Sequence, residues 1–79
     1  MIESRLIRIL RWVEKPLTTR EAYDYQFTIP NFRPMISLGI WAGNVNSHIK
    51  RRVPKVARRK NSRGRWEYYL LEWDNYRVH

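Results

Sequence analysis

The first amphipathic segment of the chain spans residues 2–14. Its apolar residues recur at i, i+4, i+7, i+8 and i+11, the spacing of one helical face: Ile2, Leu6, Ile9, Leu10 and Val13. Pro16 disfavours helical backbone in the residue before it, so we expect this helix to end near Glu14. Trp12 lies beside the apolar face and is expected to cover the edge of the core.

A second helix is predicted from its start signal. Thr18-Thr19-Arg20-Glu21 fits a capping box, with Leu17 and Ala22 at the two positions of a hydrophobic staple. We expect this helix to reach about Phe27. The prolines in the stretch 28–34 predict a loop, and Met35–Leu38 is expected to form one more helical turn before Gly39.

The stretch from Leu38 to Arg52 is predicted to hold a tight turn at Gly39 and then a short amphipathic helix. Its start is expected at about Ala42, with Asn44 as an alternative N-cap. Val45, Ile49 and Val53 share the apolar face. The opposite face and its flanks carry small, polar or cationic residues: Gly43, Asn44, Asn46, Ser47, His48, Lys50 and Arg51. Trp41 is interpreted either as a core residue or as a partner contact.

Residues 55–73 are predicted to form a β-hairpin. Residues 55–60 form the first strand, Asn61–Gly64 the turn, and Arg65–Trp73 the second strand, which is rich in aromatic and branched residues. Residues 74–79 are interpreted as a polar tail, which leaves 1–73 as a single domain.

Charge is distributed unevenly along the 79 residues, whose formal net charge is +9. No Asp or Glu occurs between Tyr25 and Trp66, a stretch that contains ten cations: Arg33, Lys50, Arg51, Arg52, Lys55, Arg58, Arg59, Lys60, Arg63 and Arg65. The remainder of the chain holds six cations and seven acids. A field of one sign suits a polyanionic partner, because each neutralised phosphate releases counterions.

Several function classes are disfavoured. The chain has no cysteine, no signal-peptide pattern, and no apolar run near the roughly 18 residues that span a membrane. No catalytic, metal-binding or phosphate-loop motif occurs, and in a strand Glu67 and Glu72 would point to opposite faces. We therefore expect no enzyme activity, no cofactor, no metal and no small-molecule ligand.

Three stretches resemble the winged-helix DNA-binding family: Leu38-Gly-Ile40, Val45 to Arg52, and the basic hairpin from Arg58 to Leu71. The resemblance implies an α+β fold, a small winged helix-turn-helix in which three helices precede a two-stranded β-hairpin wing. It also implies a recognition helix in the major groove and a wing on the adjacent minor groove or backbone. Two features depart from the family pattern, the long stretch from Thr18 to Gly39 and Trp41 in place of a capping Ser or Thr.

Site residues follow from the resemblance by position. Base contacts are assigned to Asn44, Ser47, His48 and Arg51. Backbone contacts are assigned to Lys50, Arg52 and Lys55, and wing contacts to Arg58, Arg63 and Arg65.

The function expected from these residues is sequence-specific binding of double-stranded DNA by a small transcriptional regulator. We expect the protein to be cytoplasmic and nucleoid-associated, and to bind DNA as a homodimer or side by side. Three alternatives stay open: a viral or plasmid excision or replication accessory factor, an RNA-binding module, and a protein–protein adaptor. In the adaptor, the loop at Phe32 and Trp41 would form the interface.

Overall fold

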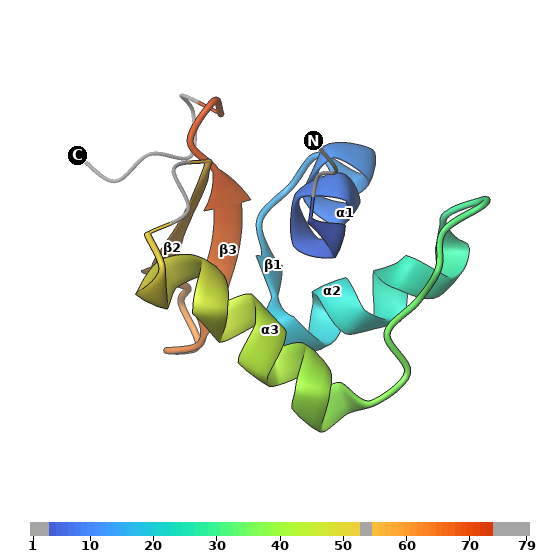
Figure 1. Cartoon of the computed structure of the whole chain (residues 1–79). Coiled ribbons are helices and arrows are strands. Elements are labelled where there is room, and N and C mark those ends of the chain that lie inside the picture. The colour runs from blue at the N-terminus through green and yellow to red at the C-terminus, as the bar shows by residue number, and fades with distance from the viewer. Residues whose placement is uncertain (1–3, 53–54, 74–79) are drawn as a thin grey trace.

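The computed structural model describes residues 4–52 and 55–73. Within them the chain forms an α+β fold with three α-helices, a short 3-10 helix and a three-stranded antiparallel sheet (Figure 1). The elements follow in the order α1 Arg5–Val13, β1 Leu17–Thr18, α2 Thr19–Tyr25, η1 Gln26–Thr28, α3 Leu38–Lys50, β2 Val56–Lys60 and β3 Trp66–Leu70. The three helices gather on one side of the sheet (Figure 1).

Helix α1 buries the predicted face. Leu6, Ile9 and Leu10 are fully buried, and Ile7 joins them. The Ser4 hydroxyl accepts a hydrogen bond from the Ile7 amide at 3.3 Å and caps the helix, which therefore begins at Arg5 and not at residue 2 as predicted. The helix ends as predicted before Pro16, with Glu14 in the left-handed region at φ 61°. Trp12 is 55% exposed, so the expectation that it covers the core edge is wrong. Ile2 lies outside the described residues.

The capping box of α2 is confirmed. The Glu21 amide donates to the Thr18 hydroxyl at 3.2 Å, and the Thr18 amide donates to the Glu21 carboxylate at 2.9 Å. Leu17 and Ala22, the staple residues, are fully buried. Leu17 and Thr18 also form β1, which pairs with Tyr68 and Glu67 of β3. The predicted two-stranded wing is therefore part of a three-stranded sheet in the order β1-β3-β2, with β3 in the centre and β2 at one edge.

The segment between α2 and α3 is a long loop held by specific contacts. The buried side-chain amide of Gln26 donates to the Met35 carbonyl at 2.9 Å and accepts from the Met35 amide at 2.8 Å. The Tyr23 hydroxyl donates to the Ile36 carbonyl. Phe32 packs against the core, with the Arg8 guanidinium 5.0 Å from its ring centroid. The predicted helical turn at 35–38 is wrong, because helical backbone begins only at Leu38.

Helix α3 is longer than predicted. It spans 13 residues and begins at Leu38, four residues before the expected start at Ala42. Ser37, not Asn44, is the N-cap, because its hydroxyl accepts a hydrogen bond from the Ile40 amide at 3.3 Å. Gly39 therefore lies inside the helix and not in a tight turn. Trp41 is a core residue: it is fully buried, and its indole donates to the Thr19 carbonyl at 3.0 Å.

The β2–β3 hairpin is confirmed with shorter strands than predicted. Val56 pairs with Leu70, Arg58 with Tyr68 and Lys60 with Trp66. At the turn, the Asn61 side chain accepts hydrogen bonds from the Arg63 and Arg65 amides, at 2.9 and 3.0 Å. The core lies between the helices and the sheet, and it includes Trp41, Val45, Val56, Tyr68 and Leu70. Val53 and the predicted tail at 74–79 lie outside the described residues.

Candidate nucleic-acid interface

Helix α3 has an inner side and an outer side. Trp41, Val45 and His48 repeat at i, i+4 and i+7 and are buried, so they form the inner side. The opposite positions are exposed and form what we call the outer side: Gly39, Ile40, Gly43, Asn46 and Lys50. These five residues are exposed in the part of the chain that the structure describes, and Asn46 also accepts a hydrogen bond from the Tyr68 hydroxyl.

The predicted base-contact residues divide between these sides. Arg51 is exposed at the C-cap of α3. Asn44 and Ser47 are half-buried on one flank, where the Ser47 hydroxyl donates to the Asn44 carbonyl at 2.6 Å. Both lie beside the outer side and not at its centre.

His48 is a correction to the sequence analysis. The residue is 5% exposed. Its Nδ1 lies 2.9 Å from the backbone carbonyl oxygen of Asn44, and its Nε2 lies 2.8 Å from the hydroxyl oxygen of Ser4. The carbonyl of Asn44 can only accept, so Nδ1 is the protonated nitrogen that donates to it. His48 thus ties α3 to the N-cap of α1. A base contact would require an exposed imidazole, so we withdraw that assignment.

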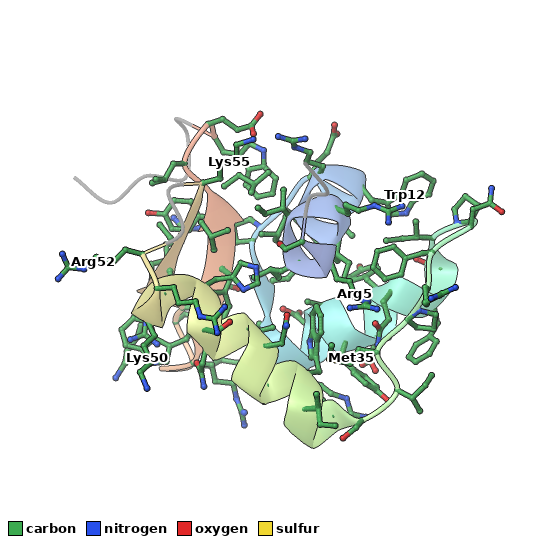
Figure 2. The ribbon with its side chains drawn as sticks, viewed as in Figure 1. Arg5, Trp12, Met35, Lys50, Arg52 and Lys55 are labelled. Carbon is green, nitrogen blue, oxygen red and sulfur yellow. The ribbon has the colours of Figure 1, made fainter. Side chains whose placement is uncertain are left out.

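Of the predicted backbone-contact residues, Lys50 and Arg52 lie at the C-terminal end of α3, and Lys55 directly precedes β2. Lys50, Arg52 and Lys55 are all exposed. The side chains of Lys50 and Arg52 extend away from the body of the protein (Figure 2). Cations at this end also complement the negative end of the helix dipole, which lowers the cost of clustering them.

Arg52 has a left-handed backbone conformation, which residues with a side chain rarely adopt. It follows the C-cap residue and has φ 53°, in the left-handed region. Its amide donates to the Ile49 carbonyl at 3.0 Å, which closes the helix end. Glycine is the usual residue at this position because a side chain there is strained. Helix termination therefore does not account for an arginine at this site.

The inner face of the hairpin carries an aromatic ring between two cations. The Arg58 guanidinium lies 4.2 Å from the Trp66 ring centroid, and the Lys60 ammonium lies 5.3 Å from it. Trp66 is 42% exposed, so these contacts form at the surface. Stacking on the ring holds the guanidinium of Arg58, one of the predicted wing residues, in a fixed place.

The tip of the hairpin presents the other two predicted wing residues. Arg63 and Arg65 are exposed on either side of Gly64, whose φ of 74° favours glycine. The Gly64 amide donates to the Asn61 carbonyl at 3.0 Å and the Asn61 amide donates to the Arg65 carbonyl at 2.9 Å. This hydrogen-bonded turn orders the backbone from which both arginines project.

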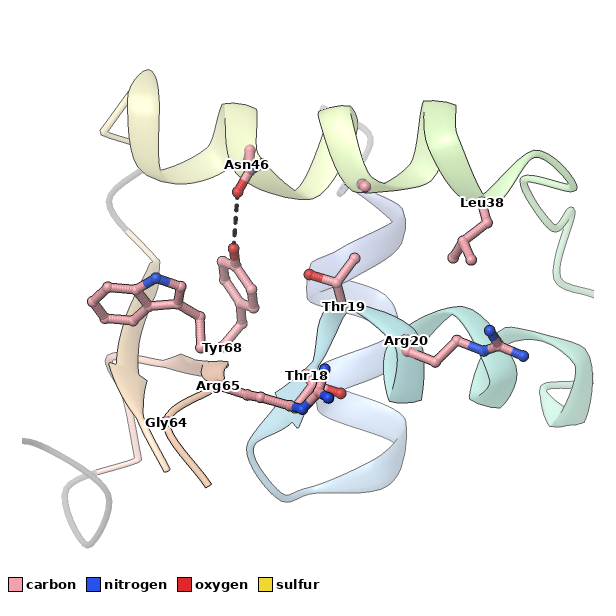
Figure 3. Close-up of a pocket in the computed structure, with 10 residues that line it drawn as sticks. Thr18, Thr19, Arg20, Leu38, Asn46, Gly64, Arg65 and Tyr68 are labelled. Carbon is pink, nitrogen blue, oxygen red and sulfur yellow. Dashed lines mark hydrogen bonds between the residues drawn. The ribbon is translucent and has the colours of Figure 1, made fainter. Parts of the chain in front are cut away.

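A groove of about 430 Å³ separates α3 from the hairpin tip. The Tyr68 hydroxyl donates to the Asn46 side chain across it at 3.1 Å, which fixes the spacing of the two elements (Figure 3). Its lining contains no acidic side chain: Thr18, Thr19, Arg20, Leu38, Ala42, Asn46, Gly64, Arg65, Trp66 and Tyr68. The groove connects the inner face of the hairpin to the outer side of α3 through Asn46, and Leu38 and Ala42 of α3 complete its lining.

Three residues of this surface were not predicted as site residues from the sequence: Arg20, Ile40 and Asn46. Ile40 was placed in a turn, Asn46 was placed on a flank, and Arg20 was treated only as part of a capping motif. Ser37 followed by buried Trp41, Val45 and His48 at helical spacing was the available signal for the earlier helix start. Arg20 joins the surface only through tertiary packing, for which the sequence carries no local signal.

No helix within residues 4–52 and 55–73 is long and apolar enough to cross a membrane. In the same part of the chain, no three His, Asp or Glu side chains come together in a way that could hold a metal ion. Comparison of the chain with family models, curated proteins and solved structures found no match.

Proposed function

We propose that this protein is a winged-helix protein that binds double-stranded DNA in a sequence-specific manner. In this proposal α3 enters the major groove, and the hairpin tip lies on the adjacent minor groove or backbone. One observation carries it: the outer side of α3 and the inner face of the hairpin carry cations and no Asp or Glu, and Asp24, beside the groove, is paired with Arg20 at 3.4 Å. The order α1-β1-α2-α3-β2-β3, with a basic hairpin directly after α3, supports the same family.

The side chains of this surface suit the two components of a duplex. Lys50, Arg51 and Arg52 can neutralise phosphates on one side of the major groove, and Arg63 and Arg65 can do so on the other. An arginine at a hairpin tip also suits a narrow minor groove, where the negative potential is enhanced. Asn46 accepts from Tyr68 through Oδ1, which leaves its amide NH₂ to donate to a base edge.

RNA binding is a weaker proposal. Recognition of single-stranded RNA uses exposed aromatic rings that stack on bases. Here Tyr68 and Tyr69 are buried, and the Trp66 ring is already in contact with Arg58 and Lys60. A protein–protein adaptor built on Trp41 and Phe32 is also weaker, because Trp41 is buried and Phe32 packs against the core.

Within DNA binding, we propose a small transcriptional regulator with a cytoplasmic, nucleoid-associated location. A viral or plasmid excision or replication accessory factor is the second candidate. Both would use the same surface. Two copies could bind as a homodimer or side by side, and the exposed Trp12 on the far side of the molecule is one surface open to such contacts (Figure 2).

The test is selection of bound sequences from random duplex DNA at about 150 mM salt, where non-specific attraction is reduced. We expect an enriched motif. A palindromic or directly repeated motif would indicate the dimer or side-by-side arrangement. Binding that disappears as salt rises, without an enriched motif, would contradict the proposal and leave only a general affinity for polyanions.

Single-charge variants connect the binding to this surface. Arg51→Ala and Arg63→Ala should each weaken binding to the selected motif and reduce the slope of log affinity against log salt by about 0.9. Lys15→Ala is the matched control: it removes one positive charge beside Tyr25, away from α3 and the hairpin. A hydrogen bond with the Tyr25 side chain raises the pKa of Lys15, so this residue is also charged. Equal effects of all three variants would contradict the assignment of the surface.

A further inference from the structure

The outer side of α3 changes character along its length. From Leu38 to Gly43 no residue has a polar side chain that could donate or accept a hydrogen bond at the surface, since the only indole, Trp41, is buried. From Asn44 to Lys50 the side chains include two amides, a hydroxyl and an ammonium. Hydrogen-bonded base reading is therefore restricted to the C-terminal half. The N-terminal half can offer only apolar contacts.

Ile40 is the prominent apolar side chain of that half. It is 65% exposed, although burying a branched aliphatic side chain is usually favourable. Gly39 precedes it and Gly43 follows about one turn later. The helix backbone next to Ile40 is therefore not covered by side chains at these two positions. A Cβ added at Gly43 would meet nothing within 4 Å, and at Gly39 it would meet only the Ser37 hydroxyl at 4.0 Å. Packing within the protein therefore requires neither glycine.

Charge indicates which partner covers this apolar patch. The same helix continues into Lys50, Arg51 and Arg52, and the facing hairpin tip carries Arg63 and Arg65. A partner that covers Ile40 and reaches these cations must combine an apolar group with negative charge nearby. The major groove of DNA has that combination, because the thymine C5-methyl group lies between two phosphate backbones.

We propose that Ile40 reads thymine by contact with the C5-methyl group, and that the uncovered helix backbone at Gly39 and Gly43 lets the base edges approach closely. This inference rests on the proposed DNA binding and adds the class of base that the N-terminal half of α3 selects. Asn46 then reads a hydrogen-bonding group on a neighbouring base pair, and Lys50 contacts a phosphate. The preferred sites contain thymine at one or more positions where loss of the C5-methyl group weakens binding.

Uracil substitution tests the inference directly, because uracil pairs as thymine does but lacks the methyl group. Duplexes of the selected motif are prepared with deoxyuridine replacing each thymidine in turn, and affinities are measured for the wild-type protein and for Ile40→Ala. At one position the wild-type protein should bind the uracil duplex about fourfold more weakly, the affinity equivalent of one buried CH₂ group. Ile40→Ala should bind both duplexes equally at that position.

Two controls keep the result specific. Ile40→Ala changes an exposed side chain to a good helix former, so its thermal unfolding should match that of the wild-type protein. Lys50→Ala should weaken binding to both duplexes while retaining the fourfold discrimination, because it removes a charge and not the methyl contact.

The outcomes separate this inference from the function on which it rests. An enriched motif in which every thymine can be replaced by uracil without loss would overturn the role of Ile40 and leave DNA binding intact. Discrimination that persists in Ile40→Ala would also overturn it. Absence of any enriched motif would overturn both. Loss of a protein partner on Ile40→Ala, with uracil tolerated, would assign the patch to protein contact instead.

Discussion

The inner and outer sides of α3 differ in whether the stability of the fold accounts for the residues they carry. On the inner side, Trp41, Val45 and His48 are buried, and every buried side-chain nitrogen or oxygen of the described residues has a hydrogen-bond partner, as the stability of a small domain requires. On the outer side, Gly39 and Gly43 weaken the helix and Ile40 is left exposed. Arg52 occupies a left-handed position directly beyond the helix. Folding explains the first set of residues and not the second, and the proposed contact with DNA would account for the second set.

The largest effect should come from the inner side. Trp41→Ala removes a fully buried indole and its hydrogen bond to the Thr19 carbonyl, and should lower the free energy of unfolding by about 3–5 kcal/mol. Urea unfolding measures this loss. The DNA affinity of the folded fraction, measured at low temperature, should be unchanged. A fully folded variant that binds DNA poorly would instead show that Trp41 contacts the partner.

A smaller effect is expected at the contact between α1 and α3. His48→Ala removes the hydrogen bonds to Ser4 and to the Asn44 carbonyl, and should cost about 1–3 kcal/mol of stability. Combined with Ser4→Ala in a double-mutant cycle, it should give a coupling free energy of about 0.5–1.5 kcal/mol. Affinity for DNA should follow only the folded fraction. Lost base discrimination with unchanged stability would restore the base contact that the sequence predicts for His48.

The smallest change in stability should have the opposite sign. Gly43→Ala places a methyl group in open space on a helix and should stabilise the protein by about 0.5–1 kcal/mol. It should weaken DNA binding, because the added methyl separates the helix from the base edges. Thermal unfolding and affinity for the selected motif are measured on the same preparation. An increase in stability without a loss of affinity would contradict the close approach at Gly43.

Local signals in the sequence predicted much of the fold. The apolar face of α1, the capping box at Thr18 and Glu21, and the turn at Asn61–Gly64 each depend on residues within one or two turns of one another. The charge distribution pointed to Lys50, Arg51, Arg63 and Arg65 as surface cations, and all four are exposed. These features need no knowledge of the tertiary structure.

The missed features depend on contacts between distant parts of the chain. Strand β1 has two residues, too few for an alternating pattern, and it exists because Leu17 and Thr18 lie against β3. The early start of α3 required Ser37 to act as a cap beside two helical glycines, which local propensity disfavours. The error at His48 has the same origin, since the start at Leu38 comes with Trp41, Val45 and His48 on the buried side, and Ser4 is 44 residues away.

A map of the surface that contacts duplex DNA tests the central claim most directly. Amide chemical shifts are followed by NMR while a duplex carrying the selected motif is added. The account predicts large changes along Ile40, Gly43, Asn46 and Lys50 and at the hairpin turn around Gly64. Changes concentrated instead at the shallow hollow formed by Arg8, Arg11, Trp12 and Ile29 would contradict it. That result would move the binding surface to the exposed side of α1.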